Sequence, residues 1–389
     1  MTANPTTEQA RHHTVLVVDD DLMITEALAA GLERENRTVI TCNDLESAQL
    51  VVERVSPSLI LTDVRLSGPF GFEGLDFIRY AKRFAPKSRI ILMTGDAPEA
   101  LQLEASERGA VAFLQKPFSV ESVESMIDLM STSEFGEPQT ARVIRIPILD
   151  EILTSESLHP VFQPIVRLDR SWKTMGFEAL ARYRTESPLR NPEVLFQYAS
   201  RKKRVCDLEL ACVARSLSAG AALAELGPLF LNIHPDVFAT GDTLSKVVLE
   251  QAQKAGVPLS RVVLEITEQG SLSDDPQVLA TVEHLQSRGV RFAFDDVGVA
   301  YSHLPFIDKI RPAFLKISQH FGTSFEADST KTKIVRNLLS LSRDFGCDLI
   351  LEGIEHASTA EAAADMGIRY GQGYYFARPA DASAFLQVQ

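Results

Sequence analysis

Two pairs of neighbouring aspartates follow apolar runs in this chain of 389 residues, and side chains of this type can bind a cation. Asp19 and Asp20 follow "TVLVV". Asp295 and Asp296 follow "RFAF". Neighbouring carboxylates repel each other, so the pKa of one must rise unless a cation lies between them. Aspartate is also common in the turns that end strands, and two coincidental turns are the alternative interpretation.

Three further polar residues follow apolar runs in the first third of the chain. Asp63 follows "LILT", Thr94 follows "ILM" and Lys116 follows "FLQ". Oxygen ligands from three carboxylates suit Mg²⁺. A hydroxyl group and a fixed positive charge suit a phosphoryl group carried by Asp63. An acidic strand-end cluster without chemistry is the alternative.

Residues 14–130 alternate short apolar runs with amphipathic stretches. The apolar runs predict strands at 15–18, 38–41, 59–62, 89–93 and 112–114. The amphipathic stretches predict helices at 22–34, 45–55, 75–84, 98–108 and 120–130. Five strand–helix units of this size predict an α/β fold with a doubly wound, five-stranded parallel sheet. Ligands bind such sheets at the carboxyl ends of the strands, where the polar residues lie.

Residues 14–130 resemble the receiver domains of two-component response regulators, which have a flavodoxin-like fold. The resemblance implies that Asp19, Asp20 and Asp63 hold a metal ion. It also implies that Asp63 is the phosphoacceptor for a sensor histidine kinase. The receiver switch positions that it implies are Thr94, Lys116 and Phe113.

The rest of the chain predicts a tail, a linker and a second domain. Residues 1–13 are polar and predict a disordered tail. Residues 131–157 contain Gly136, Pro138 and Pro147 and predict a linker with a short helix at 148–153. Residues 158–389 predict a (β/α)8 barrel. Its strands are expected at 161–166, 175–181, 229–233, 262–266, 291–294, 314–317, 348–351 and 374–376.

Polar residues again follow or end the apolar strands of this second domain, and most of them are acidic. They are Glu178, Asn232, Glu265, Asp295, Asp296, Lys316 and Glu352. Barrel enzymes build their sites at the carboxyl ends of the strands. Carboxylate and amide oxygens suit Mg²⁺ or Mn²⁺ rather than zinc. Any one of these residues could form an ordinary salt bridge, but together they predict a metal site.

Seven ordered motifs of this domain resemble the EAL family of cyclic di-GMP phosphodiesterases over about residues 155–385. They are "QPIV", "GFEALARY", "LEITE", "DDVG", "LKIS", "EGIE" and "GQGYYFARP". The resemblance implies a modified barrel with one antiparallel strand. It also implies hydrolysis of cyclic di-GMP to pGpG with two ions, Mg²⁺ or Mn²⁺, in the barrel site. The resemblance to receiver domains implies one further ion in the receiver site.

The same resemblance assigns roles to individual residues. One metal would be held by Glu178, Asn232, Glu265 and Asp295, with Glu352 nearby, and the second by Asp295 and Asp296. The catalytic group comprises Lys316, Glu352, Glu178 and Asp295, with Lys316 orienting or deprotonating the attacking water. Substrate contacts are expected from Gln163, Leu180, Arg182 and Gln372. Glu268 and Glu355 are expected to shape the site.

The loop after the second aspartate pair departs from the family pattern. The family usually reads Asp-Asp-Phe-Gly-Thr-Gly-Tyr-Ser-Ser, whereas this chain has Val297, Val299, Ala300 and His303. In the family this loop couples metal binding to dimerisation, and a homo-oligomer (a dimer or higher) is expected here. Ser318 also stands where an aspartate usually follows "LKI". All the metal ligands are present, so we expect activity.

Composition excludes several other classes of protein. A net charge of -13 argues against binding to a nucleic-acid backbone, so no DNA partner is expected. No apolar stretch approaches the roughly 20 residues of a membrane span, and no signal peptide is evident, so a cytoplasmic protein without a membrane partner is expected. Four scattered cysteines without a CxxC pair predict reduced thiols. The basic run 201–204 is interpreted as a solvated helix face, with a phosphate contact as the alternative.

Three functions compete. The leading one is a cyclic di-GMP phosphodiesterase controlled by phosphorylation. The second is a non-catalytic cyclic di-GMP receptor, a class that typically lacks metal ligands which this chain retains. The third is a transcription regulator, which is disfavoured because neither half shows a helix-turn-helix and only "ASAFLQVQ" follows the barrel.

Overall fold

The computed structural model describes residues 13–35, 37–66, 73–95, 99–130, 142–267, 275–298 and 304–386. The chain forms two compact units, each with its own sheet. Unit 1 comprises Met1–Thr154 and Arg184–Lys203, and unit 2 comprises Ser155–Tyr183 and Arg204–Gln389. Of the predicted tail, residues 1–12 lie outside the described ranges, and His13 already begins the first strand.

The sheet of unit 1 contains the five predicted parallel strands. They are β1 (His13–Val18), β2 (Arg37–Cys42), β3 (Leu59–Asp63), β4 (Arg89–Thr94) and β5 (Ala112–Gln115). A sixth strand, β6 (Arg142–Arg145), pairs in parallel with β2, and the strand order is β5-β4-β3-β1-β2-β6. β6 and helix α6 (Leu149–Thr154) both lie in the segment that was predicted as a linker.

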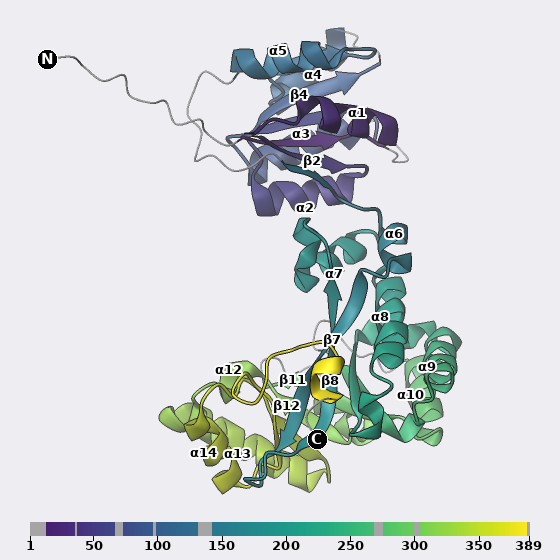
Figure 1. Ribbon diagram of the computed structural model, residues 1–389, viewed down its shortest axis with the longest axis vertical. Helices are drawn as coiled ribbons and strands as arrows, with labels where there is room; N and C mark the ends of the chain where they lie inside the picture. The colour runs from purple at the N-terminus through teal and green to yellow at the C-terminus, as the bar shows by residue number, and fades with distance from the viewer. Residues whose placement is uncertain are drawn as a thin grey trace, which may run out of the picture. The chain divides into compact units, whose positions relative to one another are not determined.

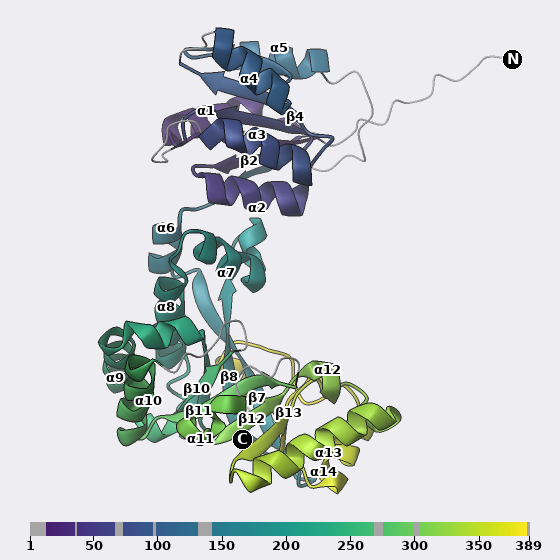
Figure 2. The same ribbon diagram turned by 180° about the vertical axis from the view of Figure 1, so that it is seen from behind.

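Helices cover both faces of this sheet (Figures 1 and 2). They are α1 (Leu22–Leu32), α2 (Leu45–Val55), α3 (Glu73–Phe84), α4 (Glu99–Arg108) and α5 (Val120–Met130). α1 and α5 share a face, where Leu28 and Ile127 pack against Val15 and Val17 of β1. α2, α3 and α4 cover the other face (Figure 2). The doubly wound parallel sheet is therefore confirmed.

Unit 1 also contains a segment from the second half of the chain. It consists of the short 3-10 helix η1 (Pro188–Arg190) and helix α7 (Pro192–Arg201). Asn191 begins α7 by accepting a hydrogen bond from the amide of Glu193 at 2.9 Å, and Pro192 occupies the first helical turn. Both residue types are favoured at these positions, because the first amides of a helix need side-chain acceptors and proline needs none.

Unit 2 is a closed barrel of eight strands. They are β7 (Leu158–Arg167), β8 (Thr174–Tyr183), β9 (Leu229–Ile233), β10 (Val262–Ile266), β11 (Arg291–Val297), β12 (Phe314–Ile317), β13 (Asp348–Leu351) and β14 (Tyr370–Gly371). β7 is antiparallel to both of its neighbours, β8 and β14, while the other neighbouring pairs are parallel. The expected single antiparallel strand is present.

The eighth strand was predicted at the wrong place. Residues 374–376 form a turn, and the strand is the two-residue β14 earlier in the chain. The turn is fixed by the amide of Tyr375, which donates to the carbonyl of Ile354 at 3.0 Å. A Cβ at Gly373 would lie 2.1–2.6 Å from backbone atoms of Ile354, so only glycine fits this close approach at the start of the turn.

Helices surround the barrel (Figure 2). The longer ones are α8 (Val205–Ala219), α9 (Asp242–Ala255), α10 (Pro276–Ser287), α13 (Ser329–Asp344) and α14 (Ala357–Met366). Short ones are η2 (Leu223–Glu225), η3 (Pro235–Thr240), η4 (Leu259–Arg261), η5 (Leu304–Phe306), α11 (Ile307–Ile310), α12 (Gln319–Gly322), η6 (Phe325–Ala327) and α15 (Ser383–Leu386). Within the described ranges, none of the helices combines the length and the apolar character that crossing a bilayer requires.

The barrel interior contains a compact apolar layer that supports the polar residues above it. The layer consists of Ile165, Phe230, Val263, Ala293, Phe314 and Ile350. Strand side chains alternate between the two faces of a sheet. The residue two positions further along β9–β13 therefore also points inward, nearer the carboxyl end. Those residues are Asn232, Glu265, Asp295, Lys316 and Glu352.

Candidate functional site

Lys316 lies at the centre of the polar layer in the barrel and contacts four carboxylates. Its Nζ atom is 2.7 Å from Glu352, 3.0 Å from Glu265, 3.2 Å from Glu178 and 3.3 Å from Asp295. The Lys316 side chain is only 1% exposed, and Glu265 is fully buried. One ammonium cannot neutralise four carboxylates, so the cluster carries excess negative charge in a region of low dielectric.

Glu178 of β8 is oriented by two amide side chains. Asn232 donates to its Oε1 at 2.9 Å, and Gln372 donates to its Oε2 at 2.7 Å. Gln372 also donates to Gln163 at 3.1 Å, and Gln163 donates to the carbonyl of Ala377 at 3.0 Å. Buried polar groups need such partners. The predicted residues Glu178, Asn232, Gln163 and Gln372 therefore lie in one network.

The pKa values of these acids differ because their partners differ. Burial raises the pKa of Glu265 well above its usual range, and it raises the pKa of Glu352 to about 8. Burial also raises the pKa of Asp295. Burial would raise the pKa of Glu178 as well, but Lys316, Asn232 and Gln372 together lower it. Burial would lower the pKa of Lys316, yet its four carboxylate neighbours raise it well above the usual value.

The donor set fits a divalent cation. Among the described residues, both oxygens of Glu265 and the Oδ1 atom of Asp295 are buried and accept no hydrogen bond, although Lys316 lies within ion-pair distance. Buried carboxylate oxygens without hydrogen-bond donors are costly unless a cation binds them. Carboxylate and amide oxygens are hard ligands of the kind that Mg²⁺ and Mn²⁺ prefer. The excess negative charge of the cluster also favours binding of a divalent cation.

The Asp295–Asp296 pair occupies an irregular end of β11. The register with β12 shifts between Phe294 and Val297, and Asp296 has a left-handed φ of 51°. In a regular strand neighbouring side chains point to opposite faces, and a bulge breaks that alternation. Asp295 is half-buried against Lys316, and Asp296 is exposed rather than buried among the outer helices. The two neighbouring carboxylates therefore differ in exposure, and the Oδ1 atom of Asp295 is buried.

Of the remaining predicted residues of the barrel, Leu180, Arg182 and Glu355 lie in the described part of the chain and the others do not. Leu180 and Arg182 follow Glu178 at every second position of β8, so all three share one face, and both are half-buried. Burial lowers the pKa of Arg182, whose guanidinium donates to the carbonyl of Ala181 at 2.8 Å. Glu355 is exposed. Glu268 and residues 299–303 of the altered loop lie outside the described residues.

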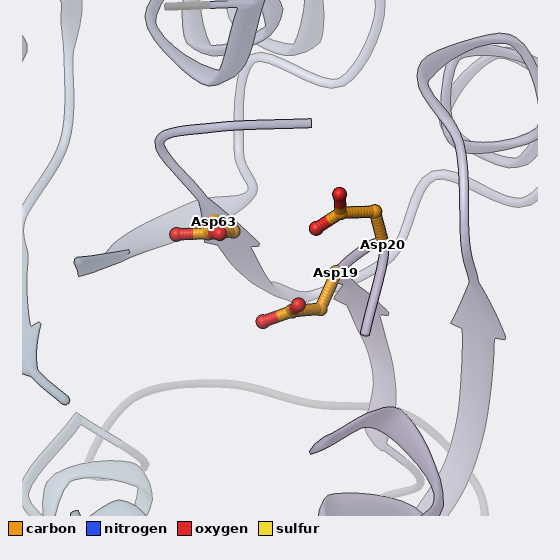
Figure 3. Close-up of side chains that lie close together, drawn as sticks. All are labelled: Asp19, Asp20 and Asp63. Carbon is orange, nitrogen blue, oxygen red and sulfur yellow. The ribbon is translucent and has the colours of Figure 1, made fainter. Parts of the chain in front are cut away.

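A second acidic cluster lies at the carboxyl ends of β1 and β3 in unit 1. Carboxylate oxygens of Asp19, Asp20 and Asp63 lie within 4.8 Å of one another, close enough to share one metal ion. Figure 3 shows the three side chains close together. Lys116, which follows β5, lies 2.7 Å from Asp19 and 3.2 Å from Asp63. The sequence therefore predicted the members of this cluster.

Burial and charge distinguish the residues of this cluster. Burial raises the pKa of Asp19, whereas Asp20 is exposed. Burial would lower the pKa of Lys116, but Asp19 and Asp63 raise it. Thr94 is buried at the last position of β4, the strand next to β3, and Phe113 is half-buried in β5. A phosphoryl group on Asp63 would therefore have the Lys116 ammonium beside it.

The sequence did not reveal two features of these sites. One is the central place of Lys316 among four carboxylates, although its inward position on β12 follows from strand alternation. The other is Asn43, whose amide group donates to the carbonyl of Asp19 at 2.9 Å and to the hydroxyl of Thr25 at 3.1 Å. No motif marked Asn43, because its role depends on contacts between loops that are distant in sequence.

Comparisons with known proteins agree with both halves. A family model described as an EAL domain matches residues 148–379, and one described as a response regulator receiver domain matches residues 15–128. The cyclic di-GMP phosphodiesterase RocR of Pseudomonas aeruginosa is 24% identical over 389 residues, covering 96% of this chain and 97% of RocR.

Two solved structures resemble the barrel. A standalone EAL protein from Vibrio cholerae O395, in a cyclic di-GMP bound form, is 26% identical with a TM-score of 0.50 and covers 58% of this chain and 93% of that chain. BlrP1 of Klebsiella pneumoniae, in a manganese and cyclic di-GMP complex, is 24% identical with a TM-score of 0.51 and covers 59% of this chain and 58% of that chain. The chain therefore belongs to the EAL domain family, whose members are phosphodiesterases, and carries a response regulator receiver domain before its EAL domain.

Proposed function

We propose that this protein hydrolyses cyclic di-GMP to the linear dinucleotide pGpG, and that phosphorylation of its receiver domain controls the rate. The observation that carries the proposal is the set of four carboxylates around Lys316 at the carboxyl ends of the barrel strands. RocR, which is similar over nearly the whole chain, is named a cyclic di-GMP phosphodiesterase.

Divalent cations, Mg²⁺ or Mn²⁺, would supply a Lewis acid for the phosphodiester and lower the pKa of a water molecule. We propose that Glu178, Asn232, Glu265 and Asp295 hold one ion and that Asp295 and Asp296 hold a second, with Glu352 nearby. The buried oxygens of Glu265 and Asp295 that accept no hydrogen bond support this assignment. We propose that a third ion binds to Asp19, Asp20 and Asp63 in the receiver.

The chain's own side chains would position the reacting groups. The Lys316 ammonium lies within ion-pair distance of four carboxylates, so it suits orienting the attacking water and stabilising negative charge on the phosphate oxygens. Arg182 offers a guanidinium on the same face of β8 as Glu178, which suits a phosphate oxygen. Gln163, Leu180 and Gln372 would contact the nucleotide, and Glu268 and Glu355 would shape the site.

Product analysis tests this function. Purified full-length protein is incubated with cyclic di-GMP and either Mg²⁺ or Mn²⁺, and the nucleotides are separated by chromatography. The proposal predicts pGpG as the product and no reaction after removal of the divalent cation. The competing receptor function predicts binding of cyclic di-GMP without pGpG in either metal, and that result would overturn the proposal.

The receiver would be phosphorylated on Asp63 by a sensor histidine kinase. The phosphoryl group adds about two negative charges next to Asp19 and Asp20, which would draw Lys116 and Thr94 towards it. We propose that this change, which also involves Phe113, activates hydrolysis. We also propose that the protein is a homo-oligomer, which light scattering of the purified protein tests directly.

A further inference from the structure

The chain leaves the barrel after β8, a strand that carries a site residue, and returns to it at α8. Strand β8, which carries Glu178, ends at Tyr183, and residues 184–203 then belong to unit 1 before α8 resumes the barrel. Within unit 1, α7 of this segment contacts α2 of the receiver, and both views show the two helices side by side (Figures 1 and 2). A single segment thus packs as part of the receiver while being covalently continuous with a site strand.

The first contact between the two helices is centred on Asp44, the residue that begins α2. Tyr198 of α7 is fully buried, and its hydroxyl donates to the Oδ2 atom of Asp44 at 3.0 Å. Lys202, directly after α7, lies 3.2 Å from the same oxygen and 2.9 Å from Glu46. Burial, followed by the charge of Asp44 and its hydrogen bond, raises the pKa of Tyr198, so the hydroxyl remains a donor.

The second contact is an ion pair at the other end of α2. Arg201 lies 2.7 Å from Glu53, and their side chains are 25% and 19% exposed. Tyr80 of α3 donates a hydrogen bond to the same carboxylate. Burial would raise the pKa of Glu53, but these two partners lower it. The basic run that the sequence suggested to be a solvated face therefore binds an acidic face of α2 through two of its members.

Hydrogen bonds join this interface to the phosphoacceptor cluster. The Oδ1 atom of Asp44 accepts from the amide of Ser47 at 2.8 Å, which caps α2. The preceding residue, Asn43, donates to the carbonyl of Asp19 at 2.9 Å, and the amide of Asp19 donates to the carbonyl of Cys42 at 3.1 Å. The loop that positions Asp44 for α7 is therefore tied to the backbone of an aspartate next to Asp63.

We infer that residues 184–203 are the coupling element through which the state of the receiver reaches the barrel site. The inference rests on the proposed function, because it assumes receiver-controlled hydrolysis. Charge added at Asp63 acts on Asp19, the Asp19–Asn43 link shifts the start of α2, and α7 moves with the acidic face that binds it. Because the segment continues from β8, this movement acts on the strand that carries Glu178.

A contiguous chain of contacts is not itself evidence of coupling, so the test must perturb the interface alone. Arg201→Glu places a second carboxylate beside Glu53, and the double variant Glu53→Arg with Arg201→Glu restores an ion pair of opposite polarity. Lys203→Glu is the matched control, because it makes the same change of charge, from a cation to a carboxylate, two positions away from Arg201. It is exposed and, among the described residues, forms no ion pair.

The experiment measures cyclic di-GMP hydrolysis by the full-length proteins with and without beryllofluoride, a mimic of the aspartyl phosphate. In wild type and Lys203→Glu the mimic should change the rate by about 5–150-fold, the usual range of such couplings. In Arg201→Glu the change should fall to less than about twofold, and the double variant should recover most of it. An unaltered response in Arg201→Glu would overturn the inference while leaving the proposed function intact.

Amide hydrogen exchange of residues 192–201 provides a readout that does not need catalysis. Beryllofluoride should change the protection of this helix in wild type, leave it unchanged in Asp63→Asn, and have less effect in Arg201→Glu. If the mimic alters neither exchange nor hydrolysis in wild type, both receiver control and the coupling element are wrong. If it alters exchange but not hydrolysis, the segment senses the receiver without transmitting, which also contradicts the inference.

Discussion

At the scale of single residues, the acids of the barrel site occupy positions that strand alternation dictates. Glu265, Asp295 and Glu352 each lie two residues beyond a buried apolar residue of β10, β11 or β13. Glu178 lies in the middle of β8. Their burial is tolerable only with a cation, and the described structure provides Lys316 in that role. The proposed metal ions would share this role of neutralising the buried carboxylates.

We predict that Glu178→Ala, Asp295→Ala and Glu352→Ala each reduce turnover of cyclic di-GMP by at least about a hundredfold, because each removes a ligand or charge worth several kcal/mol in the transition state. The proteins should still fold, because these residues lie at an open end of the barrel. Circular dichroism, which reports the helices and strands, checks this. Glu361→Ala, an exposed glutamate on α14, is the control and should hydrolyse normally. Normal turnover in any of the three would remove that residue from the site.

Lys316→Ala should lower kcat far more than it changes KM. A group that orients water and stabilises developing charge acts mainly in the transition state, so its loss appears in the chemical step. Steady-state kinetics at saturating metal measure both constants. A raised KM at unchanged kcat would make Lys316 a binding residue instead.

The same variant should make folding depend on divalent cations. Without Lys316, four carboxylates at the site have no ammonium partner, and leaving buried charge uncompensated costs about 3–5 kcal/mol. Adding Mn²⁺ should therefore raise the Tm of Lys316→Ala by more than it raises the Tm of wild type. Equal Tm increases in the two proteins would show that the cation does not bind where the ammonium was.

At the scale of elements, the short helix α12 packs against the backbone of a site residue. A Cβ at Gly322 would lie 1.8 Å from the carbonyl oxygen of Glu352, which is closer than any real contact. We predict that Gly322→Ala displaces Glu352, lowers the Tm and reduces turnover by more than about tenfold. A small misplacement of a catalytic group can reduce the rate by that much. Gly95→Ala, where an added methyl meets no atom within 4 Å, is the stability control.

Most of the elements were predictable, and the exceptions have physical reasons. The aromatic run at 374–376 has strand-like composition, but Tyr374 and Tyr375 are 51% and 42% exposed, and hydrogen bonds to Gly373 and Ile354 hold a turn. The actual strand, β14, has two residues and too little pattern to detect. β6 was missed because four residues with two arginines form a strand only by pairing with the edge of β2.

At the scale of the whole molecule, sequence patterns predicted the residues that meet in two candidate sites but not the segment that joins their units. The acids of both sites were found because each follows an apolar strand, which is a local signal. Tyr198 contacts Asp44, which is 154 positions away in the sequence, and Arg201 contacts Glu53, which is 148 positions away. No local periodicity encodes such a contact, so residues 184–203 were predicted as part of the barrel domain.

The central claim is that one chain joins a phosphoryl-accepting receiver to a barrel that hydrolyses cyclic di-GMP. The measurement that tests it most directly is the initial rate of pGpG formation by wild type and Asp63→Asn, each with and without beryllofluoride and with Mg²⁺ present. We predict that wild type forms pGpG and that the mimic raises its rate by about 5–150-fold, whereas the rate of Asp63→Asn does not change. Absence of pGpG, or a wild-type rate that the mimic leaves unchanged, would contradict the account.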